Sequence, residues 1–321
     1  MNKKSSDMPN KATFRPGAVF VVLSVALAAA VCFRIYLSAK DYFEYQKVLE
    51  VYSQFETLPD DAFPDFDMTE FTPADMTADT VTVESDIAAE TRAQGSSDSG
   101  TNATAAPAPV TTAAPRSTEA ATTAAKKVYT FADFVAQLSW LDRKYDDFYC
   151  WIRIENTVIN YPVVQGGDNE YYLNHDIYGN KLSLGAIFAD YRCGSPDKAR
   201  NIVIYGHRAK YSVMFNQLAN YMDKSFFNAN PYVYLYTPEK TYVYEVYTAY
   251  KSSMYSDFNQ TEFYSDESSL EHMNSFYSGA DQKRDVTLKA SDRILTLSTC
   301  TNTDQSERYV VQARLVSVAG N

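Results

Sequence analysis

The chain has 321 residues, and its 40 acidic against 29 basic side chains give a formal net charge of −11. This length suits one large domain or two ordinary ones. The acidic balance argues against a nucleic-acid-binding protein, which neutralises phosphates with clustered Lys and Arg. The four cysteines, Cys32, Cys150, Cys193 and Cys300, have no CxxC spacing, and the chain has three histidines. We therefore expect no metal site and no cofactor.

The N-terminal residues have the pattern of a membrane-targeting segment. Residues 1–16 are basic, and residues 17–33 carry no charge. With the apolar residues that follow, the span 17–37 approaches the roughly 20 residues that cross a bilayer. A basic flank favours the cytoplasmic side of a membrane. The pattern predicts a single-pass cell-membrane protein with a cytoplasmic tail (1–16), a transmembrane signal anchor (17–37) and an extracellular remainder.

Two alternatives stay open for this apolar segment. The run ALAAA could contain a signal-peptidase cleavage site, which would remove the segment from the mature protein. Cys32 could instead be a lipoprotein acceptor, although the preceding Val31 is larger than the small residue expected there.

Two different compositions follow the apolar span. Residues 38–58 are predicted to form a helical stalk, because aromatic and aliphatic side chains recur at helical spacing: Tyr42, Tyr45, Val48, Leu49 and Tyr52. We expect this helix to have no specific partner. Residues 59–126 are rich in Thr, Ala, Pro, Ser and acidic residues, which cannot bury enough apolar surface to offset the entropy lost on ordering. We expect a disordered tether there, followed by a folded domain over 127–321.

The domain over 127–321 is predicted to be mainly β. It opens with a helical pattern for which Thr130 is a candidate N-cap. About eight short β-type runs then follow: WIRIEN, VINYPVVQ, LGAIFADYR, NIVIYGH, YVYLYT, TYVYEVYTAYKSS, ILTLSTC and RYVVQARLVSV. This spacing is typical of a closed or nearly closed barrel rich in antiparallel pairs. Residues 212–223 and 262–278 are predicted helices, and we expect the second to overhang the functional site.

The last two predicted strands bring a thiol and a guanidinium together. The run ILTLSTC ends at Cys300, a polar loop follows, and Arg308 opens the next strand. A thiolate that attacks a carbonyl generates an oxyanion, which a fixed cation stabilises. A Cys in an apolar strand is usually an inert core residue, as we expect for Cys150. Cys193 lies in a predicted loop, and a disulfide between it and Cys150 stays open.

His207 is the candidate acid/base. It ends the β-type run NIVIYGH, after a glycine that permits a tight turn, so its placement matches that of Cys300. The other two histidines suit structural or solvated roles, because His175 lies in a polar turn and His272 on a predicted helix. Asp304 and Glu307 are near enough in sequence for a direct role, but neither is assigned as a third catalytic member.

These motifs resemble the sortase family, and within it class B. The pattern TLSTC (296–300) with a downstream Arg308 is the sortase signature. The stretches YPVVQGGDNEYYL (161–173) and YGHRAKYSVMF (205–215) are specific to the class B type. The resemblance covers most of the domain. It implies a closed eight-stranded sortase-type β-barrel, with N-terminal helices and a helical insertion before the Cys strand.

The resemblance also implies roles for single residues. Cys300 would be the nucleophile, His207 the general acid/base and Arg308 the oxyanion or substrate-positioning residue. Asn169, Leu173 and Tyr205 would line a substrate groove, although Asn169 is equally suited to forming a turn. From the residues themselves, Ser298 shares a strand face with Cys300, and the backbone N–H of Thr301 is a candidate oxyanion donor. Ser298 is equally suited to a cross-strand hydroxyl pair.

A sortase of this type is a cysteine transpeptidase of the Gram-positive cell surface. The resemblance implies that it cleaves a C-terminal sorting motif of surface proteins after Thr and joins the product to a peptidoglycan amine. A pilus-assembling enzyme that uses a pilin Lys amine is the alternative. A papain-type thiol hydrolase fits less well, because that family places its Cys at a helix N-terminus. An inactive surface-binding module fits less well too, because Cys300, His207 and Arg308 are all present.

Overall fold

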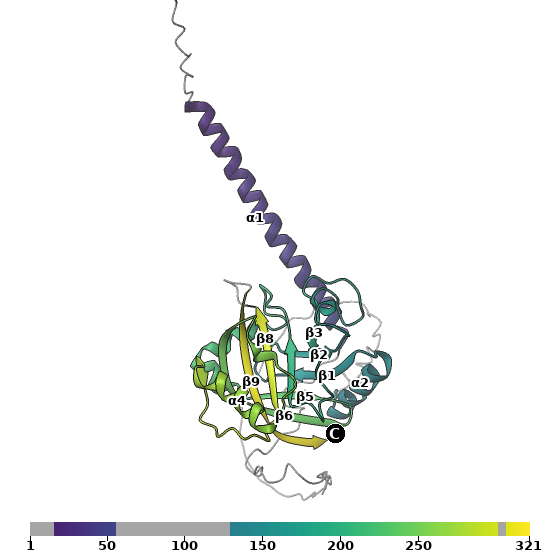
Figure 1. Ribbon diagram of the computed structural model, residues 1–321. Coiled ribbons are helices and arrows are strands. Elements are labelled where there is room, and N and C mark those ends of the chain that lie inside the picture. The colour runs from purple at the N-terminus through teal and green to yellow at the C-terminus, as the bar shows by residue number, and fades with distance from the viewer. Residues whose placement is uncertain (1–15, 56–128, 301–305) are drawn as a thin grey trace, which may run out of the picture.

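The computed structural model describes residues 16–55, 129–300 and 306–321, and for residues 16–24 and Cys300 it describes the backbone alone. The predicted tether (59–126), Thr301 and Asp304 lie outside the described residues. Figure 1 shows a barrel from which one long helix extends.

Eight strands close into the barrel, in the order β5-β1-β2-β3-β4-β8-β9-β6 with β6 pairing back to β5. Their bounds are β1 (Phe148–Arg153), β2 (Asn160–Val164), β3 (Ile187–Ala189), β4 (Asn201–Tyr205), β5 (Tyr232–Tyr236), β6 (Lys240–Ser253), β8 (Ile294–Cys300) and β9 (Glu307–Gly320). The short β7 (Gln282–Lys283) pairs with the far part of β6. The β2–β3 and β4–β8 pairs are parallel and the other pairs of the barrel are antiparallel. The prediction of a closed eight-stranded barrel is confirmed.

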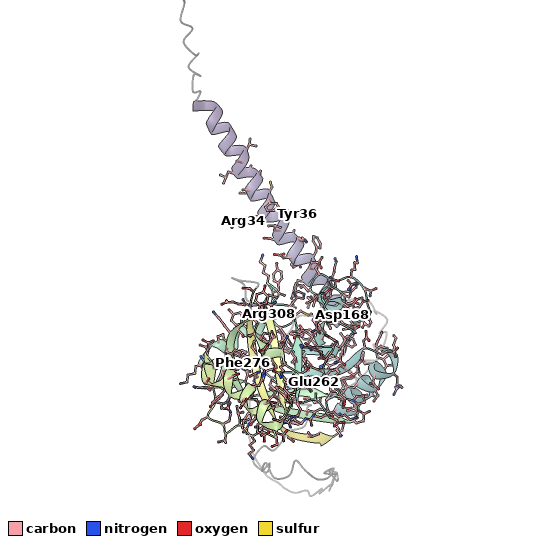
Figure 2. The ribbon with its side chains drawn as sticks, viewed as in Figure 1. Arg34, Tyr36, Asp168, Glu262, Phe276 and Arg308 are labelled. Atoms are coloured by element: carbon pink, nitrogen blue, oxygen red, sulfur yellow. The ribbon has the colours of Figure 1, made fainter. Side chains whose placement is uncertain are left out.

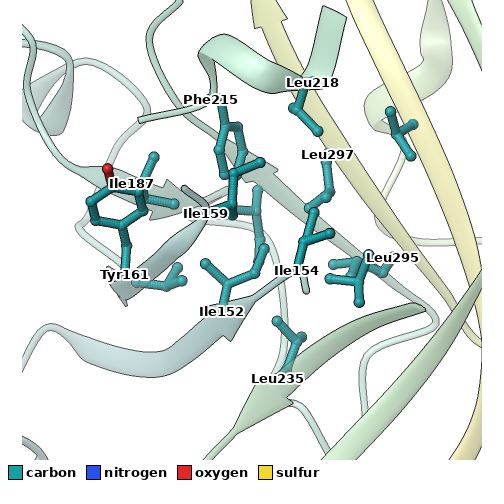
Figure 3. Packing of buried hydrophobic residues seen from close by; sticks show 14 of the residues in the cluster. Ile152, Ile154, Ile159, Tyr161, Ile187, Phe215, Leu218, Leu235, Leu295 and Leu297 are labelled. Atoms are coloured by element: carbon teal, nitrogen blue, oxygen red, sulfur yellow. The ribbon is translucent and has the colours of Figure 1, made fainter. Parts of the chain in front are cut away.

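Branched aliphatic side chains fill the barrel. Ile152, Leu235 and Leu297 come from three strands and meet in one cluster with Phe215 and Leu218 from the β4–β5 connection (Figure 3). Strands such as β4 are apolar on both faces because connecting segments cover the outside of the barrel as well. Burying so much apolar surface is the main source of stability for this fold.

Short helices pack around the barrel. Their bounds are α2 (Phe131–Lys144), η3 (Tyr171–Leu173), η4 (Asn216–Met222), α3 (Lys224–Ala229), η5 (Asp257–Asn259) and α4 (Asp266–Ser278). Thr130 caps α2 in a capping box with Asp133, and Phe134 of α2 packs edge-on against Trp151 with ring centroids 5.5 Å apart. The helix expected over 212–223 is instead the 3₁₀ turn η4 followed by α3. That over 262–278 begins later, at Asp266, after the cap Ser265.

The helix α1 (Pro16–Tyr52) contains the segment that we expected to span a membrane. Within the part of the chain that the structure describes, no helix is both long enough and apolar enough for that. The predicted transmembrane anchor, and with it the predicted cell-membrane localisation, is therefore wrong. The apolar run is interrupted by Arg34, and Lys40 and Asp41 follow within the same helix.

The C-terminal part of α1 packs on the barrel. Val48 is only 1% exposed and joins the main core cluster, and Tyr52 packs edge-on against Tyr161 with ring centroids 4.9 Å apart. Tyr45 lies against Tyr211, with ring centroids at 4.8 Å. The helix predicted to have no specific partner thus contacts the β4–β5 connection, which begins just after β4.

Candidate active site

Strand register brings the predicted catalytic residues to one edge of the barrel. In the parallel β4–β8 pair, Tyr205 lies opposite Ser298. His207 comes two residues after Tyr205, and Cys300 comes two residues after Ser298. Because the two strands run in parallel, His207 and Cys300 lie at the same edge of the sheet. In the antiparallel β8–β9 pair, Cys300 lies opposite Arg308. Arg308 lies at the end of the barrel from which α1 extends (Figure 2).

Close packing fixes the backbone beside His207. A Cβ on Gly206 would stand 2.4 Å from Ile187 Cδ1 and 2.8 Å from Phe215 Cγ, so only glycine fits there. The amide of Phe215 donates to the His207 carbonyl oxygen at 3.1 Å. His207 Nε2 lies 2.7 Å from the Leu173 carbonyl oxygen. Because a carbonyl only accepts, Nε2 carries a proton, and Nδ1 is the nitrogen left to accept or donate one.

Arg308 occupies the opposite side of the same edge. Its Nη1 donates to the Glu307 carbonyl oxygen at 3.0 Å, and its Nη2 lies 3.9 Å from Met254 Sδ. The thioether is a weak acceptor. An oxyanion is a stronger acceptor for a guanidinium than a thioether is.

A groove of about 280 Å³ adjoins this edge. His207 and Arg308 line it, and so do four predicted substrate-binding residues: Asn169, Leu173, Tyr205 and Ser298. It is completed by residues that the sequence did not single out: Phe188, Met254, Phe258, Asn259 and Thr299. The wall expected from residues 262–278 is thus formed by residues 254–259 ahead of that helix. The helix α4 instead supports this segment from behind, through Phe276 stacked on Tyr250.

Asp190 organises one end of the groove and was missed by the sequence analysis. It is completely buried just after β3. Its carboxylate accepts from Arg192 Nε at 2.8 Å and Nη2 at 2.7 Å, from Tyr205 Oη at 2.9 Å and from Asn169 Nδ2 at 2.9 Å. Burial alone raises the pKa of this carboxyl, but the Arg192 bonds and the hydroxyl and amide donors outweigh burial and bring the pKa below its ordinary value.

Asn169 and Tyr205 are therefore fixed by two partners each. Asn169 Oδ1 also accepts from the backbone N–H of Tyr191 at 3.1 Å, and Tyr205 Oη also accepts from Asn259 Nδ2 at 3.0 Å. Burial and the neighbouring Asp190 charge raise the pKa of Tyr205, so its hydroxyl stays protonated. The sequence pattern that could have identified this cluster is FADYR, in which Asp190 directly follows an apolar strand. An acidic residue in that position needs hydrogen-bond partners or solvent.

Two buried hydroxyls in the groove have no protein partner within the described residues. These are Ser298 Oγ and Thr299 Oγ1, and both residues line the groove. Buried polar groups almost always form hydrogen bonds in proteins. The cross-strand hydroxyl pair considered for Ser298 is therefore not formed among the described residues.

The other two histidines and the two buried cysteines do not line the groove, and Asp304 lies outside the described part of the chain. His175 stacks on Tyr171 at 4.1 Å, and His272 is buried on α4, which lowers its pKa. Cys150 and Cys193 are buried free thiols, and no disulfide joins them. Burial raises the pKa of Cys193 to about 12, which keeps the thiol protonated and inert. Glu307 is the first residue of β9.

Comparison with known proteins matches this barrel to one family. The sortase domain family matches residues 152–316, just over half of the chain. Sortase B of Listeria monocytogenes is 32% identical over 183 residues, which cover 56% of this chain and 74% of that protein. Sortase B of Staphylococcus aureus is 30% identical over 185 residues, covering 57% and 76% of the two chains.

Solved structures agree with that match. The X-ray structure of Clostridium perfringens sortase B is 34% identical, with a TM-score of 0.53, and the alignment covers 57% of this chain and 99% of that one. The Staphylococcus aureus sortase B–substrate complex is 29% identical, with a TM-score of 0.54 and coverage of 57% and 85%.

The fold and these relatives define the protein as a cysteine transpeptidase. The chain belongs to the sortase family, and within that family to class B.

Proposed function

We propose that the protein cleaves surface proteins after the Thr of a C-terminal sorting motif and transfers them to an amine of peptidoglycan. The proposal is supported by the strand register, in which Cys300 pairs with Arg308 and Ser298 pairs with Tyr205, the residue two before His207. The motif class is the Asn-Pro-x-Thr-x type that the class B resemblance implies. The catalytic unit in this proposal is the domain over 127–321.

Cys300 is the nucleophile in the first half-reaction. Its thiolate attacks the Thr carbonyl carbon, a C–S bond forms, and the negative charge moves to the carbonyl oxygen. Arg308 stabilises this oxyanion, and the backbone N–H of Thr301 is the second proposed donor. His207 in its charged form gives a proton from Nδ1 to the leaving amine as the C–N bond breaks. The products are a thioacyl-enzyme and the free C-terminal fragment.

The second half-reaction runs in the opposite sense. An acceptor amine attacks the thioester carbon, and neutral His207 takes the proton that this amine loses. The C–S bond breaks, and Cys300 leaves as the thiolate. The new amide joins the surface protein to the acceptor, and both catalytic groups return to their starting protonation states.

The groove residues hold the acyl part of the substrate in this scheme. Leu173 offers an exposed apolar side chain, and Asn169 and Tyr205 are held in place by Asp190. Ser298 supplies a hydroxyl that has no other partner among the described residues. These contacts are compatible with a short extended peptide that lies along the groove and ends at Cys300.

The test is cleavage of a quenched fluorescent Asn-Pro-Ala-Thr-Ala peptide by the full chain. We expect cleavage by the wild type, none by Cys300→Ala, and a new amide product when a peptidoglycan-type amine is added. Undiminished cleavage by Cys300→Ala would rule out the proposed nucleophile. Product formation with a pilin-type Lys amine but not with the peptidoglycan amine would instead identify a pilus-assembling enzyme.

A further inference from the structure

A second and larger hollow lies beside the groove. Its volume is about 490 Å³, and it is lined by Tyr191, Arg192 and the segment 260–264. None of these residues lines the groove itself. The proposed chemistry at Cys300 leaves this hollow without a role.

Two residues of the groove connect it to this hollow. Asn169 accepts from the backbone N–H of Tyr191, and the Asn259 carbonyl oxygen accepts from Arg192 Nη2 at 3.1 Å. Asn169 and Asn259 line the groove, whereas Tyr191 and Arg192 line the hollow. The two spaces are therefore adjacent, and Asn169 and Asn259 form part of the wall between them.

The shared wall lies at the end of the groove away from the chemistry. Both of its residues belong to the hydrogen-bond cluster around Tyr205. Ser298 precedes Cys300 by two residues on β8, and its pairing partner Tyr205 is the last residue of β4 and precedes His207 by two residues. At about 3.3 Å per residue, this is a separation of about 7 Å along the sheet. A substrate peptide bound at Cys300 would therefore pass the Tyr205–Ser298 pair on its way to the hollow.

The order of the two half-reactions indicates in which direction the substrate peptide lies along the groove. The acyl part of the substrate stays bound through both steps, whereas the leaving peptide and the acceptor amine must exchange at Cys300. The built groove therefore holds the acyl part. Since this part is N-terminal to the cleaved bond, the hollow follows on the N-terminal side of the motif.

The hollow offers aromatic rings and one fixed cation. Tyr191 is 51% exposed, and Tyr264 is fully exposed. The Asp190 carboxylate holds the Arg192 guanidinium through Nε and Nη2 and raises its pKa. Arg192 Nη1 makes no hydrogen bond within the described residues and is left as a donor. Because Asp190 neutralises Arg192, the remaining charge in the lining is that of Glu262.

We propose that this hollow binds the substrate residue directly before the sorting motif, and that it favours an aromatic ring there. The ring stacks with Tyr191 and Tyr264, and Arg192 Nη1 donates to a backbone carbonyl of the same segment. Glu262 disfavours an acidic side chain at this position. The inference rests on the proposed function, since it extends the peptide bound at Cys300.

The test compares two quenched fluorescent peptides on the full chain. One is Tyr-Asn-Pro-Ala-Thr-Ala, and in the other Gly replaces the first Tyr. Aromatic pairs contribute about 0.5–1.5 kcal/mol, which corresponds to roughly 3- to 10-fold. We expect the wild type to have a kcat/KM higher by that factor for the Tyr peptide, mainly through a lower KM. The double variant Tyr191→Ala/Tyr264→Ala should lose this preference and keep its rate on the Gly peptide.

Tyr255→Ala is the matched control, because Tyr255 is an exposed tyrosine (82%) that lines neither space. It should retain the preference. Equal wild-type rates on the two peptides, or a preference that survives in the double variant, would overturn the inference while leaving the proposed function intact. Cleavage of neither peptide by the wild type would overturn both.

Discussion

The two ends of the groove are built differently. At the Tyr205 end, one buried carboxylate is saturated by Arg192, Tyr205 and Asn169, and these partners bond onward to their own neighbours. At the His207 end, the ring nitrogen Nε2 contacts a carbonyl, and Arg308 contacts a carbonyl and a thioether. No carboxylate among the described residues bonds to the His207 ring.

This difference separates holding a substrate from transforming it. A saturated buried network keeps its side chains in one arrangement, because each broken bond leaves an unpaired polar group. Such an end is suited to positioning. Groups that act on the reacting bond must instead change partners as the carbonyl becomes an oxyanion and the amine leaves. We expect substitutions at the His207 end to lower activity and substitutions at the Tyr205 end to lower stability.

Arg308→Lys should have the largest effect on activity. The charge is kept, but a single ammonium cannot reproduce the planar fork of donors. Loss of an oxyanion donor typically lowers turnover by about 10²-fold, and we expect a fall of that order in kcat/KM for the sorting peptide. The melting temperature should stay at the wild-type value. A Lys variant as fast as the wild type would show that the guanidinium geometry does not matter.

Asp190→Ala should have the largest effect on stability. The substitution leaves the buried hydroxyl of Tyr205 and the amide of Asn169 short of a partner and removes the anion that faces Arg192. Breaking a buried pair costs about 3–5 kcal/mol, and the lower end applies because the Arg192 side chain is 39% exposed. Urea unfolding should show a loss of about 3 kcal/mol. A loss below 1 kcal/mol would mean that water replaces the network.

The same carboxylate predicts a pH dependence. Because the pKa of Asp190 is lower in the folded than in the unfolded chain, its stabilisation is fully present above the unfolded value of about 3.9. It is lost as the pH falls through the folded pKa. The melting-temperature difference between the wild type and Asp190→Asn should therefore shrink below about pH 4. A difference that stays constant from pH 6 to pH 2 would contradict this assignment.

The smallest expected effect concerns the contact between α1 and the segment around Met214, which follows His207 in the chain. Val48 of α1 is buried, and Tyr52 of the same helix packs edge-on against Tyr161. The Met214 amide donates to Tyr161 Oη at 3.1 Å. Val48→Asp should undock α1 and make the Met214 amide exchange with deuterium about tenfold faster.

Leu49→Asp is the control for this measurement, because Leu49 is the adjacent residue on α1 and is 41% exposed. It should leave exchange of the Met214 amide unchanged. Equal exchange in both variants would show that α1 does not support this loop.

The barrel and the reactive edge were predictable from the sequence for a physical reason. Strands have a period of two, and closure of the barrel fixes their register, so apolar runs such as NIVIYGH and ILTLSTC locate both their strands and the residues at their ends. The Asp190 cluster was not predictable in the same way. Asn259 lies far from Asp190 along the chain, and only the folded loops bring them to the same hydroxyl of Tyr205.

For the N-terminal helix, the sequence predicted one property wrongly and another correctly. An uncharged run of apolar residues predicted a membrane anchor, but no described helix is long and apolar enough to span a membrane. Spacing along residues 38–58 did identify the face that packs, including Tyr45, Val48 and Tyr52. It could not identify the partner, because helical periodicity says which side is buried and not against what.

Locating the acyl group during turnover tests the proposed nucleophile, Cys300, most directly. The full chain is incubated with the Asn-Pro-Ala-Thr-Ala peptide without an acceptor amine, quenched in acid, digested and mapped by mass spectrometry. We expect a mass gain equal to the Asn-Pro-Ala-Thr acyl fragment on Cys300, and none in Cys300→Ala. Peptide cleavage with the acyl fragment on another residue, or cleavage that persists in Cys300→Ala, would contradict this expectation.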